Sequence, residues 1–144
     1  MKNFLENNKD IGIFVLRVTI GIAFAFIYGL PKIQGGPEFW AMVGGAMGNV
    51  GISFGHTFWG FMASLSEFGG GILLILGLFL RPVTVFMGFT MIMATLTHFS
   101  MQDQWYNVMN PLNMLAVFIC LFFFGAGKYS LDYIFFKKNK NSLN

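Results

Sequence analysis

The chain has 144 residues, of which 56% are hydrophobic and only 10% are charged. Soluble domains carry roughly a quarter charged residues, so this chain has too few charges to cover a water-facing surface. The composition excludes a soluble globular domain, a disordered chain and, despite the net charge of +3, a nucleic-acid binder that uses a basic patch. The single cysteine excludes an internal disulfide and a thiolate-rich metal site. The sequence therefore predicts a small integral membrane protein.

Four segments approach the roughly 20 apolar residues that a membrane-spanning helix needs. In chain order they are Ile11–Leu30, Thr57–Leu80, Pro82–Phe99 and Pro111–Ala126, and Trp105–Asn110 is available to extend the last one. We do not expect the first segment to be a cleaved signal peptide, because its apolar run is too long and an arginine interrupts it. The predicted fold is an all-α, integral membrane four-helix bundle.

Prolines and glycines mark the expected helix ends. Pro31 is placed just past the first helix, because proline interrupts a helix. Arg81-Pro82 predicts a very short turn and hence an antiparallel hairpin of the second and third spans. Asn110-Pro111 is typical of an N-cap followed by proline at the first helical position. Gly125 and Gly127 suit the end of the fourth helix.

Lysines and arginines beside the spans predict the orientation of the chain. Only Lys32 lies on one side, whereas the opposite side carries Lys2, Lys9, Arg81, Lys128, Lys137, Lys138 and Lys140. Both termini are therefore expected in the cytoplasm. The predicted organisation is a cytoplasmic segment over residues 1–10, a transmembrane domain over residues 11–136 and a polar tail over residues 137–144.

The connection Ile33–His56 is longer than a simple turn requires. Pro37 is suited to begin a helix, and one face of that helix would carry Trp40, Val43, Met47 and Val50. A short interfacial helix in this first outer loop is therefore expected. Near the other end of the chain, residues 130–136 are expected to form an interfacial turn that Ser130 caps, with Asp132 near its positive end.

Two charged residues lie inside the apolar segments, and such residues usually face the bundle interior and are paired. Arg17 and Glu67 differ in expected depth by roughly 10 Å at about 1.5 Å per residue, so a direct or water-bridged pair is one interpretation. Alternatively, Arg17 reaches the cytoplasmic headgroups and Glu67 is protonated or hydrogen-bonded. The glycines of Gly69–Gly71 leave room beside Glu67 for a partner helix or a flat ligand.

Several polar groups map to the outer ends of the spans. Lys32, His56 and His98 are candidates to line one outward-facing pocket together with Trp59 and Trp105. A neutral imidazole beside a lysine suits a quinone carbonyl, and histidine can also relay protons. The alternative is that Lys32 anchors at the headgroups and the histidines lie in the wet interface, an alternative that is stronger for His56 than for His98.

Four stretches of the chain form an ordered pattern. The first span carries Leu16-Arg17, Gly21, Phe24, Gly29 and Lys32, and the second carries Glu67, Gly70-Gly71, Leu74, Gly77-Leu78 and Arg81. His98 closes the third span, and the fourth is followed by GAGKYSLD over Gly125–Asp132. In order and spacing, these stretches resemble the DoxX family of small four-helix bacterial membrane proteins. Tyr28 and Leu80 depart from the histidine and threonine that are common in that family.

The resemblance implies a multi-pass protein of the bacterial cytoplasmic (inner) membrane with a quinone-linked role. Family relatives include a subunit of a thiosulfate:quinone oxidoreductase and the membrane member of an oxidative-stress complex. By this resemblance the chain would be the membrane subunit of an oxidoreductase. Lys32 and His98 would bind a quinone, and Arg17, Glu67 and Arg81 would stabilise charge or move a proton. No metal or haem is expected, and a partner would deliver electrons.

Two other functions remain open from the sequence. The chain could be a non-enzymatic scaffold that docks a soluble redox partner at the cytoplasmic face through Arg81, Lys128 and Lys137–Lys140. It could also be a small transporter or lipid-handling protein, a reading that favours a homodimer because four spans are few for a transporter.

Overall fold

The computed structural model describes residues 2–135, and the predicted polar tail over residues 137–144 lies outside the described residues. The described chain is helical and contains no strand. Four helical stretches are long and apolar enough to cross a membrane, namely Asn8–Gln34, His56–Leu76, Leu80–Ser100 and Trp105–Phe124. The prediction of an all-α membrane protein with four spans is confirmed.

The first span does not end at Pro31. It consists of α1 (Lys2–Ile22), a π-helix η1 (Ala23–Gly29) and α2 (Leu30–Gln34), which follow one another without a break. The backbone N–H of Leu30 donates to the carbonyl of Ala25, five residues earlier. This wider turn, followed by proline in the first turn of α2, lets the helix continue where a regular α-helix would lose a hydrogen bond. The predicted end of this helix at Leu30 is therefore wrong.

The hairpin between the second and third spans is present, but its turn precedes the predicted one. Helix α4 (His56–Leu76) ends at Gly77, which adopts the left-handed conformation with φ of 63°. Helix α5 (Leu80–Ser100) begins after Phe79, so Arg81-Pro82 lies inside its first turn rather than between the helices. Proline is tolerated there because the first four N–H groups of a helix have no partner within it.

The fourth span, α6 (Trp105–Phe124), begins six residues before Pro111, which lies inside the helix. The predicted cap at Asn110 is therefore wrong, and the available extension from Trp105 is part of the span. Gly125 follows the last residue with φ of 75°, a conformation that favours glycine. The predicted C-terminal end of this helix is confirmed.

A helix forms in the long connection where Pro37 predicted one. Helix α3 (Gly36–Gly44) continues into a 3₁₀ helix, η2 (Gly45–Val50). Its tight packing on α4 depends on glycine, because a Cβ atom at Gly44 would collide with the carbonyl of His56 and one at Gly60 with that of Trp40. The location of α3 at the membrane interface stays a prediction.

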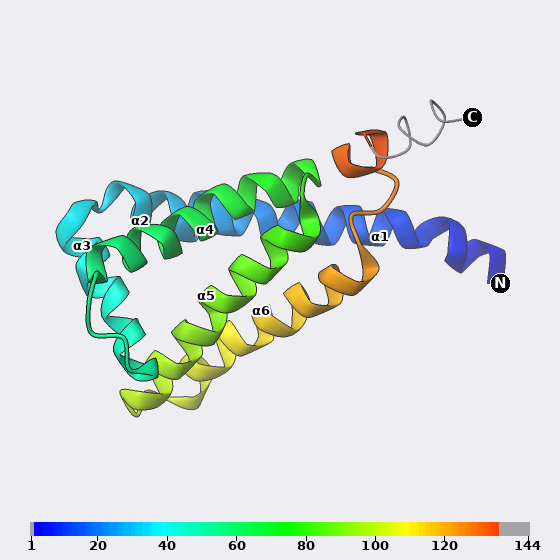
Figure 1. Ribbon diagram of the computed structural model, residues 1–144. Coiled ribbons are helices and arrows are strands. Elements are labelled where there is room, and N and C mark those ends of the chain that lie inside the picture. Colours follow the sequence, from blue (N-terminus) through cyan, green and yellow to red (C-terminus); the bar gives the residue numbers. More distant parts are fainter. Residues whose placement is uncertain (1, 136–144) are drawn as a thin grey trace.

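The spans are arranged as two antiparallel pairs that diverge toward one end of the molecule (Figure 1). The start of α1 and residues 131–135 lie toward the other end, which we call the terminal end. The diverging end, here the loop end, carries α3, η2 and the α5–α6 turn (Figure 1). Helix α4 packs on α1, η1, α3 and α5, and α5 packs on α6. The arrangement fits termini on one side of the membrane, and their cytoplasmic location stays a prediction.

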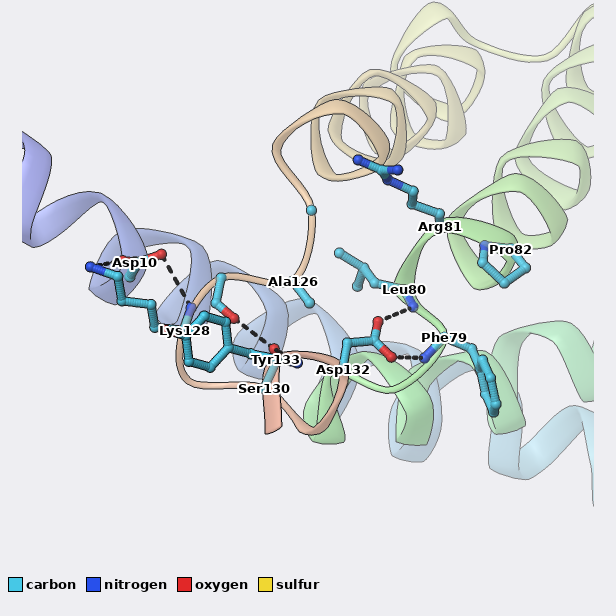
Figure 2. Close-up of a pocket in the computed structure, with 12 residues that line it drawn as sticks. Asp10, Phe79, Leu80, Arg81, Pro82, Ala126, Lys128, Ser130, Asp132 and Tyr133 are labelled. Carbon is cyan, nitrogen blue, oxygen red and sulfur yellow. Dashed lines mark hydrogen bonds and ion pairs between the residues drawn. The ribbon is translucent and has the colours of Figure 1, made fainter. Parts of the chain in front are cut away.

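The segment after α6 is fastened to the α4–α5 turn. The Asp132 carboxylate accepts hydrogen bonds from the backbone N–H groups of Phe79 at 2.8 Å and Leu80 at 3.0 Å (Figure 2). It therefore caps the N-terminus of α5, a role that the sequence did not reveal. The predicted cap by Ser130 is confirmed, because its hydroxyl accepts a hydrogen bond from the N–H of Tyr133 at 3.2 Å.

Candidate functional site

A buried ion pair joins the first two spans. The Lys32 Nζ atom donates to Glu67 Oε1 at 2.7 Å. The Glu67 side chain is only 4% exposed, whereas that of Lys32 is 33% exposed. The second carboxylate oxygen, Oε2, is buried and has no hydrogen-bond partner among the described residues. The pair therefore leaves one buried acceptor, Glu67 Oε2, without a hydrogen bond. Lys32 is the more exposed partner of the pair.

The local helix geometry brings these two residues together. The π-helix η1 ends at Gly29, whose Cα faces the backbone of Phe68 so closely that a Cβ would collide with it. Lys32 lies one helical turn beyond Gly29 and Glu67 directly precedes Phe68, so this contact places α2 beside the carboxylate. The indole Nε1 of Trp40 donates to the Lys32 carbonyl at 2.9 Å and ties α3 to the same point.

The structure does not pair Arg17 with Glu67. Arg17 is completely buried and donates to the carbonyls of Leu74 at 2.7 Å and Tyr129 at 2.6 Å. Leu74 is seven residues after Glu67, which is about 10 Å along the helix, and the arginine side chain does not cover that distance. Cations are stabilised at the C-terminal carbonyls of a helix. The burial of Arg17 is therefore explained by its hydrogen bonds, which link α4 to the C-terminal segment. The expected Arg17–Glu67 pair is therefore wrong.

Glu67 and Lys32 lie on the wall of a cavity of about 980 Å³. The cavity lies between α4 and α5, with α3 and η2 beside it, and its lining is mostly apolar. Phe58, Phe86 and Phe89 belong to this wall and are themselves 58%, 64% and 48% exposed. Since the outer faces of spanning helices contact acyl chains, the cavity is accessible to molecules dissolved in the bilayer.

The three glycines after Glu67 have two different roles. Gly69 and Gly70 line the cavity, where a side chain at Gly70 would meet the flexible side chain of Met87. Gly71 instead faces α1 and η1, and a Cβ there would be 2.8 Å from the carbonyl of Gly21. The expected close helix contacts are thus present at Gly71 and, against Met87 of α5, at Gly70, while Gly69 meets only ordinary contacts; a ligand beside this stretch stays a prediction.

His98 lines the same cavity and is paired with a residue that the sequence did not single out. Its Nδ1 atom lies 2.8 Å from Asp103 Oδ2. Asp103 follows α5 in the connection to α6, and its hydrogen bond with the His98 ring is the main cause that lowers its pKa below the ordinary value. The carboxylate is therefore ionised at neutral pH and lies within hydrogen-bond distance of the His98 ring.

Of the other three residues predicted to line this pocket, only one lines the cavity. Trp59 lines the cavity, but His56 and Trp105 do not, and Trp105 is 71% exposed. The expectation of one pocket holding all five outer residues is therefore wrong for these two. His56 begins α4 and its backbone carbonyl lies against Gly44; its location in the membrane interface stays a prediction.

Arg81 lies at the terminal end, away from this cavity. It lines a second cavity of about 620 Å³, together with residues of the C-terminal segment such as Lys128 and Asp132 (Figure 2). Nearby, Lys128 Nζ is 3.3 Å from Asp10 Oδ2, an ion pair with an exposed lysine. The structure therefore brings Lys32, Glu67 and His98 to one cavity and separates Arg17 and Arg81 from it.

Two polar contacts at the cavity were missed from the sequence. Asp103 lies in the short connection between two spans, and its spacing of five from His98 is no recognised signal in a sequence. The hydroxyls of Thr90 and Ser66 lie 3.2 Å apart, and both residues line the cavity. The Thr90 hydroxyl also bonds the Phe86 carbonyl of its own helix at 3.1 Å, which is the usual bond of such residues, so its additional contact with α4 needed the structure.

Comparison with known proteins places the chain in a family. The DoxX family model matches residues 12–100, which is more than half of the chain. The inner membrane protein YqjF of Escherichia coli strain K12 is 30% identical over 140 residues, which cover 93% of this chain and 99% of that protein. No solved structure matches. With its four spans, the chain is a multi-pass inner-membrane protein that belongs to the DoxX family.

Proposed function

We propose that the cavity between α4 and α5 binds a lipid-soluble quinone and that the chain is the membrane subunit of a quinone-linked oxidoreductase. The observation that carries the proposal is the Lys32–Glu67 pair, with its buried carboxylate, on the wall of a mostly apolar cavity. Ligand pockets of this kind have volumes of about 300–1,000 Å³ and few, well-placed polar groups. A volume of about 980 Å³ suits an aromatic head group with part of an isoprenoid tail.

The cavity residues have distinct roles in this proposal. The Lys32 ammonium has three N–H donors, and with one on Glu67 the others are left for a carbonyl oxygen of the ligand. Glu67 fixes the position of the ammonium and compensates its charge. His98 supplies a second polar contact, and the phenylalanine wall holds the apolar part. Quinones supply electron and proton transfer at their two oxygens.

Electrons would come from a partner protein, and the terminal end is the candidate docking surface. Arg81 is exposed there and makes no ion pair with the described residues, and it lines a cavity of its own. A basic residue of this kind suits an acidic surface on a soluble redox partner. In this proposal Arg17 and Arg81 do not contact the quinone.

Bound quinone is the direct test. The protein is purified in mild detergent, extracted with organic solvent, and the extract is analysed by mass spectrometry for quinones and phospholipids. We expect quinone near one equivalent in the parent chain and in the control Lys128→Met, which removes an exposed ion pair at the terminal end. We expect its loss in the double variant Lys32→Met/Glu67→Leu.

Three outcomes would contradict the proposal. Stoichiometric phospholipid without quinone would favour a lipid-handling protein, the alternative function for the same cavity. Absence of quinone in the extract, together with no saturable binding of added quinone, would favour a scaffold. A double variant that is folded and retains the quinone would show that the ion pair is not part of the site.

A further inference from the structure

The end of α5 has a geometry that places Asp103 against His98. The N–H of Asp103 donates to the carbonyl of His98 at 3.1 Å and the N–H of Gln102 to that of Phe99 at 3.1 Å. These two bonds define a Schellman motif, in which the third residue from the helix end and the second residue beyond it lie side by side. That pair is usually apolar, whereas here it is a histidine and an aspartate 2.8 Å apart.

The Schellman motif forms here although the local sequence is unfavourable for it. Its left-handed position is occupied by Gln102, with φ of 52°, where glycine is the usual residue. A glutamine in this conformation is disfavoured, so the local sequence alone does not explain the turn. What the turn achieves is the contact between the Asp103 carboxylate and a ring that lines the cavity.

We propose, resting on the function proposed above, that Asp103 is a positioning residue that holds His98 as its Nδ1–H tautomer, so that Nε2 accepts a hydrogen bond from a hydroxyl of the reduced ligand. The hydrogen bond made by one ring nitrogen decides which nitrogen carries the proton. A carboxylate only accepts hydrogen bonds, so the Nδ1 atom of a neutral His98 must donate. Nε2 is then left as an acceptor for the cavity.

This arrangement distinguishes the two redox forms of a quinone. The oxidised form has carbonyl oxygens, which accept hydrogen bonds from Lys32 but offer nothing to an acceptor. The reduced form, a quinol, has hydroxyl groups that can donate to Nε2 and still accept from Lys32. The charged groups that face the cavity beside His98 are the Lys32–Glu67 pair. We therefore expect the quinol to bind more tightly than the quinone.

The tautomer is measured by ¹⁵N NMR on protein labelled at histidine in detergent micelles, at an alkaline pH at which the ¹⁵N shifts show neutral rings. The chain has only two histidines, so the His56→Gln variant assigns the signals. We expect the Nδ1–H form for His98, its loss in Asp103→Ala and its recovery in Asp103→Glu. An Nε2–H form in the parent chain, or no change in Asp103→Ala, would overturn the inference.

Binding is measured by anaerobic calorimetry with a short-chain benzoquinone and with its quinol. One additional hydrogen bond predicts a preference of about three- to tenfold for the quinol, lost in Asp103→Ala and kept in Asp10→Ala, which removes a carboxylate at the terminal end. If neither form binds, the proposed function fails. If both forms bind equally, or if Asp103→Ala keeps the preference, only the role of Asp103 fails.

Discussion

Removing Lys32 should destabilise the protein much more than removing the charge of Glu67. In Lys32→Met the Glu67 side chain, 4% exposed, loses its hydrogen-bond partner and is left as an uncompensated buried charge. Breaking a buried pair in this way costs about 3–5 kcal/mol. In Glu67→Gln the remaining lysine is 33% exposed and can turn its ammonium toward water. The loss is then about 1 kcal/mol, because partly exposed pairs contribute little.

The assay is unfolding by titration with SDS from mild detergent, monitored by circular dichroism at neutral pH. The double variant Lys32→Met/Glu67→Leu should be within about 1 kcal/mol of the parent chain, because apolar residues replace a buried ion pair at little cost. Lys128→Met, which breaks an exposed pair, should lose less than about 1 kcal/mol. Equal losses for Lys32→Met and Glu67→Gln would refute the reasoning from burial.

Five further variants test three other contacts with the same unfolding assay. Arg17→Met should lose about 3 kcal/mol or more, because it removes charged hydrogen bonds to the carbonyls of two segments, of which the one to Leu74 is buried. Arg17→Lys should restore only part of the loss, since an ammonium cannot span both sets. Asp132→Ala should lose about 1–2 kcal/mol, the usual effect of removing an N-cap, and a loss below about 0.5 kcal/mol would contradict the capping role. Gly60→Val should separate α3 from α4, because its side chain would collide with the Trp40 carbonyl, whereas Gly69→Ala, which meets only ordinary contacts, should be tolerated.

The number of spans was predictable because bilayer thickness fixes helix length, whereas several boundaries were not. Pro31, Pro82 and Pro111 were all placed at helix starts or ends, and all three lie within helices. Proline at a first turn costs no hydrogen bond, and the π-helix before Pro31 changes which carbonyls need a donor. Hydrophobic pattern and residue type carry no signal for either effect, since both depend on how the neighbouring turns are bonded.

The candidate site was predictable in its residues but only partly in its pairing. Glu67 stood out as a charged group inside an apolar segment, and Lys32 and His98 as polar groups at the outer ends of the spans. The structure places all three on one cavity. Depth along the membrane suggested Arg17 as the partner of Glu67, but depth says nothing about which helix faces point toward each other. Because the first span continues through α2, Lys32 lies beside Glu67. The predicted end of this span at Leu30 was wrong, and the pairing was missed for that reason.

The most direct test of the central claim is photolabelling with an azido-substituted short-chain quinone in native membranes, followed by peptide mapping. The claim predicts saturable labelling on α4 and α5 at cavity residues such as Trp59 and Phe86. Unlabelled quinone should suppress it, and the folded Lys32→Met/Glu67→Leu variant should not show it. Labels spread over the outer faces of all four spans, unaffected by competitor or by the variant, would contradict a quinone site in this cavity.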